Sequence, residues 1–345
     1  MKRYHEALCA EMMLWVKQCG PFRIKRIFIG GGTPSTYPDA LLLDMSGKLR
    51  DILDVSLLEE ATIEVNPGTV RLEQLELWRE IGINRLSIGV QTLQDWQLHA
   101  LNRYHTTNDV YFLLDHAKNS FENISVDLML GLPGMSTQQW KEDLVEVVTW
   151  SIKHISLYCL MIHENTPLYF KIQKGELTLP KDDSIAKLYE WSVAFLQCHG
   201  FMQYEVSNFA QDGWESKHNF AYWDRQPYKG LGLSACSFDG QYRFQNENNL
   251  MRYLACLENE QDPVVFSEKL TPSAIRLEKL MLGLRRPSGV PLEMVLAGLD
   301  KEIREDLIQK IAQFKQRGLI CECNNHLMLT VSGFLVENEV IAQLA

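Results

Sequence analysis

The sequence has 345 residues, of which 46% are hydrophobic and 23% are charged, and its formal net charge is −10. This length allows a large core and at least two domains in an ordinary globular protein. The acidic balance argues against nucleic acid as the main partner, because phosphate binding requires clustered Lys and Arg. The absence of any run of 18 apolar residues excludes a membrane-spanning helix, and a cytoplasmic protein is the resulting prediction.

The first twenty residues are typical of an amphipathic helix and not of an export signal. The longest apolar run, 12–16, is too short for a signal peptide and is flanked by charges. Apolar side chains instead recur at helical spacing, at Tyr4, Leu8, Met12 and Trp15.

The eight cysteines form neither a disulfide framework nor a Cys-x-x-Cys pair. The one close pair is Cys321 and Cys323, which would lie on the same face of an extended strand. Two half-buried thiols or part of a metal site would both fit this spacing.

From residue 2 to about 161, β-rich apolar runs alternate with amphipathic helical stretches. Repeating units of about 30 residues predict βα units around a parallel sheet or barrel, with helix caps at Asp39, Asp95 and Ser136. The predicted strands are 24–29, 61–65, 84–88, 124–128 and 155–160, and the predicted helices are 40–53, 72–80, 93–101, 108–120 and 137–150.

Residues 30–35, Gly-Gly-Gly-Thr-Pro-Ser, directly follow the first predicted strand. Glycines allow positive φ angles and a close approach of the backbone to a ligand. A strand, a glycine turn and a helix start favour a site for a charged small molecule. The same residues would also make a plain strand-to-helix turn.

Polar side chains stand where the other predicted strands end. Glu64 ends the second strand, Gln91 follows the third, and Asp127 lies near the end of the fourth. In parallel α/β folds, ligands gather at the carboxyl ends of the strands. A capped turn or an ion pair would explain any one of these residues, but several on one rim favour a shared site.

After residue 161 the alternation stops. A helix is predicted over 182–200, followed by a segment rich in aromatic and polar residues up to about 246. Thr271-Pro272 then begins a series of helices. The predicted order is helices at 273–284, 291–297 and 301–318, a hairpin of 319–323 and 326–329 across Asn324-Asn325, and a last helix from Ser332.

This order of elements resembles a winged helix. Winged helices often bind DNA, so a regulator with a vestigial barrel is one interpretation. The acidic charge favours a packing or partner-docking domain instead.

Several longer segments, spread over essentially the whole chain, resemble one known family. They are Ile-Phe-Ile-Gly-Gly-Gly-Thr-Pro-Ser (27–35), Ile-Glu-Val-Asn-Pro-Gly-Thr (63–69), Asn-Arg-Leu-Ser-Ile-Gly-Val-Gln (84–91), Asp-Leu-Met-Leu-Gly-Leu-Pro-Gly (127–134), Gln-Tyr-Glu-Val-Ser-Asn-Phe-Ala (203–210), His-Asn-Phe-Ala-Tyr-Trp (218–223) and Gly-Leu-Gly-Leu-Ser-Ala (230–235).

With these segments the chain resembles the HemW-type heme chaperones, a branch of the oxygen-independent coproporphyrinogen III oxidase family of radical S-adenosyl-L-methionine (SAM) proteins. The His-Asn-x-x-Tyr-Trp pattern favours the chaperone branch over the decarboxylating oxidase of porphyrin biosynthesis, which is the alternative. The resemblance implies a partial (β/α)6 radical SAM barrel over 1–165. An aromatic-rich α+β segment over 166–265 and a winged-helix-like domain over 266–345 would follow.

The resemblance also implies a SAM site on the rim of the barrel. Glu64 would bond the ribose hydroxyls, and the glycine turn would lie along the methionine part. Arg103 follows Asn102, where the family more often has Gly, but the Arg itself is retained. The matching residues are Gly31, Gly32, Thr33, Glu64, Gln91, Arg103 and Asp127.

Heme contact is implied at His218, Asn219, Tyr222 and Trp223, and an unidentified acceptor protein would receive the heme. An imidazole can ligate heme iron, and aromatic rings can cover the porphyrin. Without the resemblance, His218 would be interpreted as a hydrogen-bonded histidine beside an aromatic cluster.

Family members carry a strand and a Cys-x-x-x-Cys-x-x-Cys loop ahead of the helix with which this sequence begins. Those thiolates hold a [4Fe–4S] cluster whose fourth iron binds SAM. This sequence contains no such triad. We therefore expect a barrel without its first strand, no bound cluster and no oxidase activity, in a truncated or mis-started chain or in a cluster-less paralogue.

Overall fold

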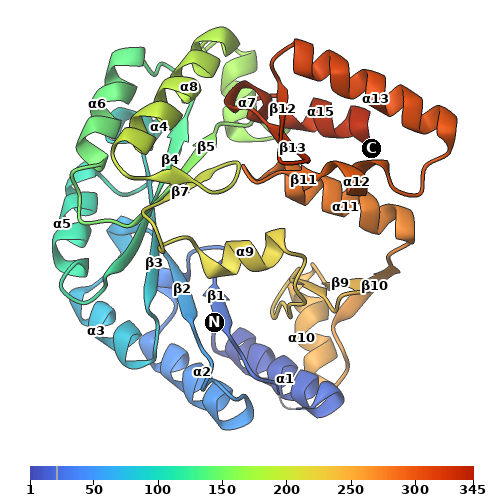
Figure 1. Ribbon diagram of the computed structural model, residues 1–345. Helices are drawn as coiled ribbons and strands as arrows, with labels where there is room; N and C mark the ends of the chain where they lie inside the picture. Colours follow the sequence, from blue (N-terminus) through green and yellow to red (C-terminus); the bar gives the residue numbers. More distant parts are fainter. Residues whose placement is uncertain (21) are drawn as a thin grey trace.

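The computed structural model describes residues 1–20 and 22–345, and a seven-stranded sheet forms its centre (Figure 1). The strand order is β1-β2-β3-β4-β5-β7-β6, in which β1 to β5 are parallel and β7 is antiparallel to β5 and β6. The predicted, mostly parallel α/β sheet is confirmed. The strands are β1 (Arg26–Ile29), β2 (Glu60–Val65), β3 (Arg85–Gln91), β4 (Asn123–Leu130), β5 (His154–Cys159), β6 (Met202–Gln203) and β7 (Asn208–Ala210).

Amphipathic helices alternate with these strands, as the sequence predicts. Figure 1 shows most of these helices on the outside of the sheet, where their apolar stripes bury its outer face, whereas the first helix packs on the second. They are α1 (Lys2–Cys19), α2 (Asp39–Ile52), α3 (Leu72–Glu80), α4 (Asp95–Ala100), α5 (Thr107–Ala117), α6 (Thr137–Val147), α7 (Pro167–Gln173) and α8 (Asp182–Cys198).

The predicted helix caps are confirmed at one position and wrong at two. Ser136 accepts a hydrogen bond from the backbone three residues into α6. Asp39 is instead the first helical residue of α2, and its carboxylate bonds side chains at the start of α3. Asp95 is likewise the first residue of α4 and accepts a hydrogen bond from the backbone N–H of Thr107, at the start of α5. Both carboxylates therefore link neighbouring helices.

The outer face of the sheet is apolar. Alternate side chains of a strand point to opposite faces, and on this face they are the aliphatic ones. Their exposed fractions are 0% for Ile63, Leu86, Ile88, Val126 and Ile155. This face forms the main core of the protein.

The inner face of the same sheet is polar, which is unusual in a parallel sheet because both faces are normally covered by apolar helices. The strand register places Glu64 beside Ser87, and Asp127 beside Ser156. Other members of this row are Glu60, Thr62, Arg85, Ser125 and His154, which are at most 3% exposed.

A second, antiparallel sheet lies in the aromatic-rich region, where the sequence pattern predicts no strand bounds. It comprises β8 (Cys236–Phe238), β9 (Tyr242–Asn246) and β10 (Val264–Lys269), in the order β10-β9-β8. Five of the six residues of β10 are exposed, so this strand shows none of the alternation of a half-buried strand. The region also contains α9 (Lys217–Trp223) and α10 (Leu250–Glu258).

Buried Glu11 of α1 connects this region to the first helix. Its carboxylate accepts hydrogen bonds from Gly232 N, Asn246 Nδ2 and Tyr253 Oη at 2.7–2.8 Å. Segments more than 200 residues apart in sequence are thereby held side by side.

The C-terminal region matches the predicted order of helices and hairpin. Asn324 and Asn325 both have positive φ, as a tight hairpin turn requires. The predicted last helix from Ser332 is wrong as a single helix, because it is broken into α14 (Val331–Phe334) and α15 (Glu337–Leu344). The other elements are α11 (Pro272–Leu284), β11 (Val290–Pro291), α12 (Leu292–Leu296), α13 (Lys301–Gln316), β12 (Ile320–Cys323) and β13 (His326–Leu329).

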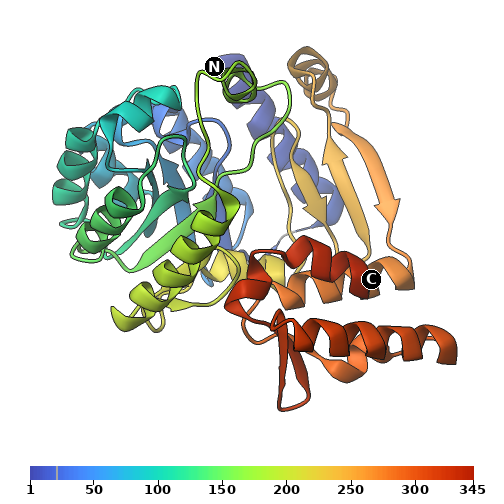
Figure 2. The same cartoon turned by 90° about the horizontal axis from the view of Figure 1, so that it is seen from above.

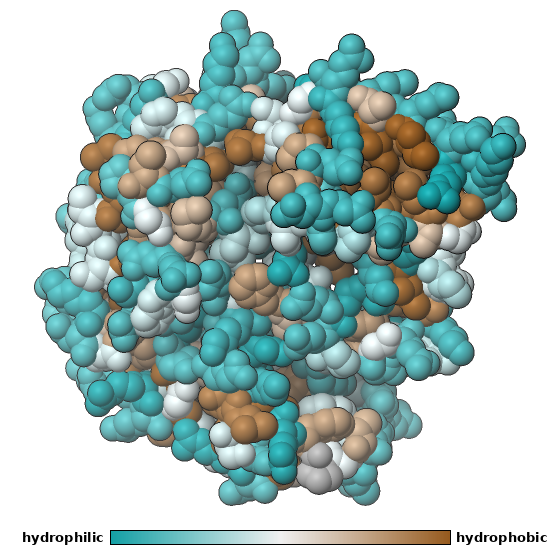
Figure 3. All heavy atoms as spheres, in the orientation of Figure 1, coloured by the Kyte–Doolittle hydropathy of each residue, from teal (hydrophilic) through white to brown (hydrophobic). Residues whose placement is uncertain are grey.

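Polar contacts join this region to the rest of the molecule. Arg286 pairs with Asp224 at 2.6 Å, Arg225 pairs with Glu278 at 2.9 Å, and α14 packs on α8. Figure 2 shows the C-terminal helices beside α8 and α9. In Figure 3, hydrophobic side chains are grouped over the C-terminal helices, on a face that is otherwise mostly hydrophilic. In the described parts of the chain, no helix is both long and apolar enough to cross a membrane.

Candidate functional site

The glycine turn after β1 and the end of β2 are in direct contact. The backbone N–H of Gly31 donates to the Glu64 carboxylate at 3.0 Å, and both Gly31 and Gly32 have positive φ. A Cβ at Gly30 would lie 3.0 Å from the Glu64 carboxyl carbon, so a larger residue would collide there. The turn therefore presents its backbone beside an acidic side chain. Apart from the adjoining residues, no atom of the described chain lies within 4 Å of a Cβ placed on Gly31 or Gly32.

Gln91 ends β3 in a strained conformation. Its φ is 69°, in the left-handed region that non-glycine residues rarely adopt, and the register with β4 shifts just before it. The residue is only 7% exposed. Strain at a buried polar residue on a strand end is typical of functional sites.

Asp127 lies on the inner face of β4. Burial raises the pKa of its carboxyl to about 6, and the neighbouring charge of Glu64 acts in the same direction. Hydrogen bonds from Ser156 and Ser87 and the charge of Arg85 oppose this shift. Glu64 and Asp127 are thus close enough to influence each other, as the predicted rim requires.

The two remaining predicted rim residues, Thr33 and Arg103, have fewer contacts with the other rim residues. Thr33 precedes the short 3-10 helix Pro34–Thr36, and its carbonyl accepts a hydrogen bond from the Thr36 hydroxyl. Arg103 follows α4 in the loop after β3. In residues 1–20 and 22–345, no side-chain hydrogen bond or ion pair joins Arg103 to the other rim residues.

His218 lies in the first turn of α9, and buried Glu60 holds the start of that helix. The Glu60 carboxylate accepts from the backbone N–H of Lys217 at 2.9 Å, from that of His218 at 3.0 Å and from the Ser216 hydroxyl at 3.1 Å. A carboxylate is favourable there because the N-terminus of a helix carries partial positive charge. Glu60 therefore fixes α9 against the sheet.

The His218 ring lies between two aromatic side chains. It stacks on Phe28 of β1 with ring centroids 4.5 Å apart, and Tyr222 meets it edge-on at 4.8 Å. Burial is the main reason that the pKa of His218 is lowered to about 4, so the imidazole is neutral at pH 7.

The ring nitrogens of His218 and of the buried His154 differ in whether they have hydrogen-bond partners. Both nitrogens of His154 are occupied, by Ser125 Oγ at 2.7 Å and Tyr204 Oη at 2.8 Å. Across the described residues, no hydrogen bond occupies either ring nitrogen of His218. Its lone pair is therefore available to a ligand.

The three other predicted heme residues also lie on α9 or at its end, in different settings. Asn219 donates its side-chain amide to Tyr204 Oη at 3.2 Å. Tyr222 is 40% exposed, whereas the indole nitrogen of Trp223 is buried and has no partner among the described residues. The predicted cluster is thus assembled by one short helix.

Phe28 connects the glycine turn with α9. Its ring stacks on His218 and lies 2.6 Å from the Cβ position of Gly30, which also faces Glu64. Phe28 therefore places the glycine turn and Glu64, which belong to the predicted rim, next to His218.

The sequence analysis misses three functional candidates, namely Phe28, Glu60 and Arg85. Arg85 is 3% exposed, and its Nε has no partner in the part of the chain that the structure describes. A detectable signal is the period-two polar spacing within apolar strands, as in Glu60-x-Thr62-x-Glu64.

The described cysteines do not assemble an iron–sulfur site. The group of potential metal ligands found there contains a single cysteine, Cys9, with His5 and Asp44. Cys321 and Cys323 lie on β12, but both are exposed, so the interpretation as half-buried thiols is wrong. Among the described residues they belong to no such group either, so the metal site finds no support. The residues present do not fit a [4Fe–4S] cluster.

Two family models match the sequence. The radical SAM superfamily matches residues 2–147, and the HemN C-terminal domain matches residues 270–336. Together they cover the parallel strands β1 to β4 and most of the C-terminal region.

Individual relatives match over most of the chain. The heme chaperone HemW of Bacillus subtilis is 34% identical over 98% of this chain and 89% of its own length. The mitochondrial radical S-adenosyl methionine domain-containing protein 1 of Mus musculus is 33% identical over 91% of this chain and 76% of its own length.

A solved structure confirms the fold. HemN of Escherichia coli, described as a coproporphyrinogen III oxidase and radical SAM enzyme, superposes with a TM-score of 0.83 at 21% identity, over 99% of this chain and 82% of its own length. The fold and the relatives over the full chain agree with the segments that the sequence analysis singles out. The chain therefore belongs to the radical SAM family that includes the HemW heme chaperones.

Proposed function

We propose that this protein is a heme chaperone, which binds heme beside α9 and passes it to an acceptor protein. The observation that carries the proposal is the His218 imidazole, which is neutral at pH 7 and stacks on Phe28, and whose ring nitrogens have no hydrogen bond among the described residues. A neutral imidazole is the form that ligates heme iron. The relationship to proteins named heme chaperone HemW supports the same function.

In this proposal His218 is the iron ligand, and the aromatic rings of Tyr222 and Trp223 lie against the porphyrin. Half-exposed Tyr222 offers an apolar ring with a polar tip. Asn219 has a supporting role, because its amide is already bonded to Tyr204. The cationic Arg85 is a candidate partner for a heme carboxylate, since it carries a buried unpaired Nε.

We also propose that the rim binds SAM. Positive φ and open space at Gly31 and Gly32 fit a turn whose backbone approaches a ligand. Glu64, Gln91 and Asp127 would supply polar contacts, with Thr33 and Arg103 at the margins. In radical SAM proteins SAM is the radical precursor, which requires the cluster, and the residues described here hold none. We derive no radical step.

The domain division over 1–165, 166–265 and 266–345 stays a proposal, and the strand bounds favour moving both of its boundaries. The first unit is proposed to end at residue 165. The central sheet continues beyond that residue, because its strands β6 and β7 run up to Ala210. The boundary proposed at 265/266 falls inside β10, which runs to Lys269, so a boundary after Leu270 is better. A partial barrel and a winged-helix-like C-terminal unit remain our proposals for the architecture.

The cytoplasmic location, the exclusion of nucleic acid as a partner and the transfer of heme to an acceptor protein stay predictions. The net charge of −10 supports the second of these.

Hemin titration of the full chain tests the heme proposal. We expect a shifted Soret band that saturates at one heme per chain. His218→Ala should abolish or strongly alter this band, whereas His116→Ala, at a half-buried position on α5, should leave it unchanged. An unaltered band in His218→Ala, with native circular dichroism, would overturn the assignment.

Calorimetry with SAM tests the rim separately. Glu64→Gln removes the charged acceptor and should weaken binding by roughly 1.5–3 kcal/mol, while the hemin spectrum stays as it is. Binding that is equally strong in this variant would place SAM elsewhere.

A further inference from the structure

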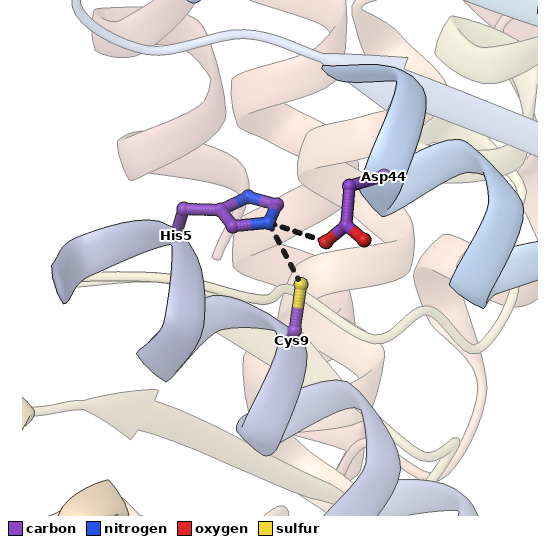
Figure 4. A group of neighbouring side chains, drawn as sticks. All are labelled: His5, Cys9 and Asp44. Atoms are coloured by element: carbon purple, nitrogen blue, oxygen red, sulfur yellow. Dashed lines mark hydrogen bonds and ion pairs between the residues drawn. The ribbon is translucent and has the colours of Figure 1, made fainter. Parts of the chain in front are cut away.

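Three potential metal ligands converge between the first two helices (Figure 4). His5 and Cys9 are one helical turn apart on α1, and Asp44 faces them from α2. The Nε2 atom of His5 lies 2.7 Å from Asp44 Oδ2 and 3.6 Å from Cys9 Sγ, and no two of the three ligand atoms are farther apart than 4.8 Å. None of these residues belongs to the site described above.

The arrangement is that of a coordination site and not of a catalytic relay. A Cys–His–Asp relay uses the two ring nitrogens for the two partners. Here the same nitrogen, Nε2, faces both the thiol and the carboxylate, whereas Nδ1 faces the Tyr37 hydroxyl at 2.9 Å. Three different donor atoms therefore point to one place.

The spacing fits a small tetrahedral cation. Metal–ligand bonds of about 2.0–2.3 Å separate neighbouring ligand atoms by about 3.2–3.6 Å in that geometry. The 3.6 Å between Nε2 and Sγ already matches this separation. Asp44 must turn slightly, and its side chain is free to do so because it is 44% exposed.

The surroundings supply burial, access and a supporting contact. His5 is 3% and Cys9 is 2% exposed, so solvent is excluded on their side, and Asp44 forms the entrance. Metal-ligating histidines commonly bond their other nitrogen to a fixed polar group, and Tyr37 Oη occupies this place. The hydroxyl can accept from Nδ1–H once a cation takes Nε2.

We propose that His5, Cys9 and Asp44 bind a borderline-soft divalent cation of the Zn²⁺ class, which clamps α1 to α2. Imidazole, thiolate and carboxylate are the donors that this class prefers, and three protein ligands leave a fourth position for water. When the cation takes Nε2, the one proton of the neutral imidazole stands on Nδ1 and is donated to Tyr37 Oη, and the Cys9 thiol releases its proton to solvent. The proposal does not depend on heme binding.

Lys48 sets the affinity of this site. Its ammonium pairs with Asp44 Oδ2 at 2.5 Å and so competes with a cation for the same carboxylate. Lys48→Met should therefore tighten metal binding, which a purely structural ion pair would not predict.

Titration of the chelator-treated full chain with Co²⁺ tests the proposal, because a cobalt–thiolate bond gives a near-ultraviolet charge-transfer band. We expect one such band per chain, lost in Cys9→Ser, and an affinity at least tenfold lower in His5→Gln and in Asp44→Asn. Zn²⁺ should displace Co²⁺ and raise the melting temperature of the wild type but not that of Cys9→Ser.

The double variant Cys321→Ser/Cys323→Ser is the matched control, since it removes two exposed thiols elsewhere and should keep the band. A band that survives Cys9→Ser, or one that disappears in this double variant, would overturn the site. Absence of any thiolate band in the folded wild type would do so as well.

Discussion

The two faces of the central sheet contrast in composition although the same strands build both. On the outer face, Leu86, Ile88 and Val126 have no exposed surface and pack beneath the helices. On the inner face, Arg85, Ser87 and Asp127 alternate with them along the same chain segments.

The contrast separates stability from function within single strands. The outer face stabilises the fold through apolar burial. The inner face keeps charged groups out of water, which costs stability unless each group has a partner, and it positions the glycine turn and α9. Substitutions on the outer face should therefore lower stability, whereas those on the inner face should change the pH dependence of stability or the binding of ligands.

The largest change in the free energy of unfolding is expected for a substitution on the outer face. Leu86→Ala removes a fully buried side chain at the centre of the core and should lower the free energy of unfolding by about 2–5 kcal/mol. Denaturant unfolding measures the change. Leu43→Ala, at a position that is 46% exposed, should change it by less than about 0.5 kcal/mol. Equal losses in both variants would contradict the division of the two faces.

The next effect depends on pH and belongs to the inner face. The pKa of Asp127 is about 6 in the fold, above the value of about 3.9 in an unfolded chain, so the folded state binds more protons between these values. Stability contributed by this group is present below pH 4 and is lost as pH rises through 6, by on the order of 2–3 kcal/mol.

Asp127→Asn removes that loss. The variant should be more stable than the wild type at pH 7.5 and should match it near pH 4, as thermal unfolding in a pH series will show. A constant difference across the series would mean that burial does not shift this carboxyl. Glu64 and Arg85, the charges that face Asp127, remain unchanged in this comparison.

A smaller effect is expected where the sheet meets α9. Glu60→Gln keeps the size of the side chain but removes the charge that binds the start of this helix, and should cost about 1–3 kcal/mol. The hemin spectrum should change together with stability, because His218 loses its fixed position. A Glu80→Gln control alters an exposed carboxylate on α3 and should leave the spectrum intact.

The smallest effect concerns the stacked pair. Phe28→Leu keeps an apolar side chain against His218 but loses the ring–ring contact, worth about 0.5–1.5 kcal/mol. The Soret band should shift without losing intensity. Complete loss of heme binding would indicate that Phe28 itself contacts the porphyrin.

Local patterns in the sequence determine most of the secondary structure. Strand β2, helix α3 and the hairpin at Asn324-Asn325 follow from apolar periodicity and turn residues within a few positions. The glycine turn and Glu64 are visible for the same reason, since strand ends in a parallel sheet meet at one edge.

Contacts between distant segments depend on the tertiary structure alone. Glu60 binds the start of α9 across more than 150 residues, Phe28 stacks on His218 across 190, and His5 meets Asp44 from another helix. No local period encodes such pairings, because each depends on how whole elements pack. The sequence therefore determined the elements and the polar residues at the strand ends, and only packing decided that Phe28 and Glu60 both contact His218.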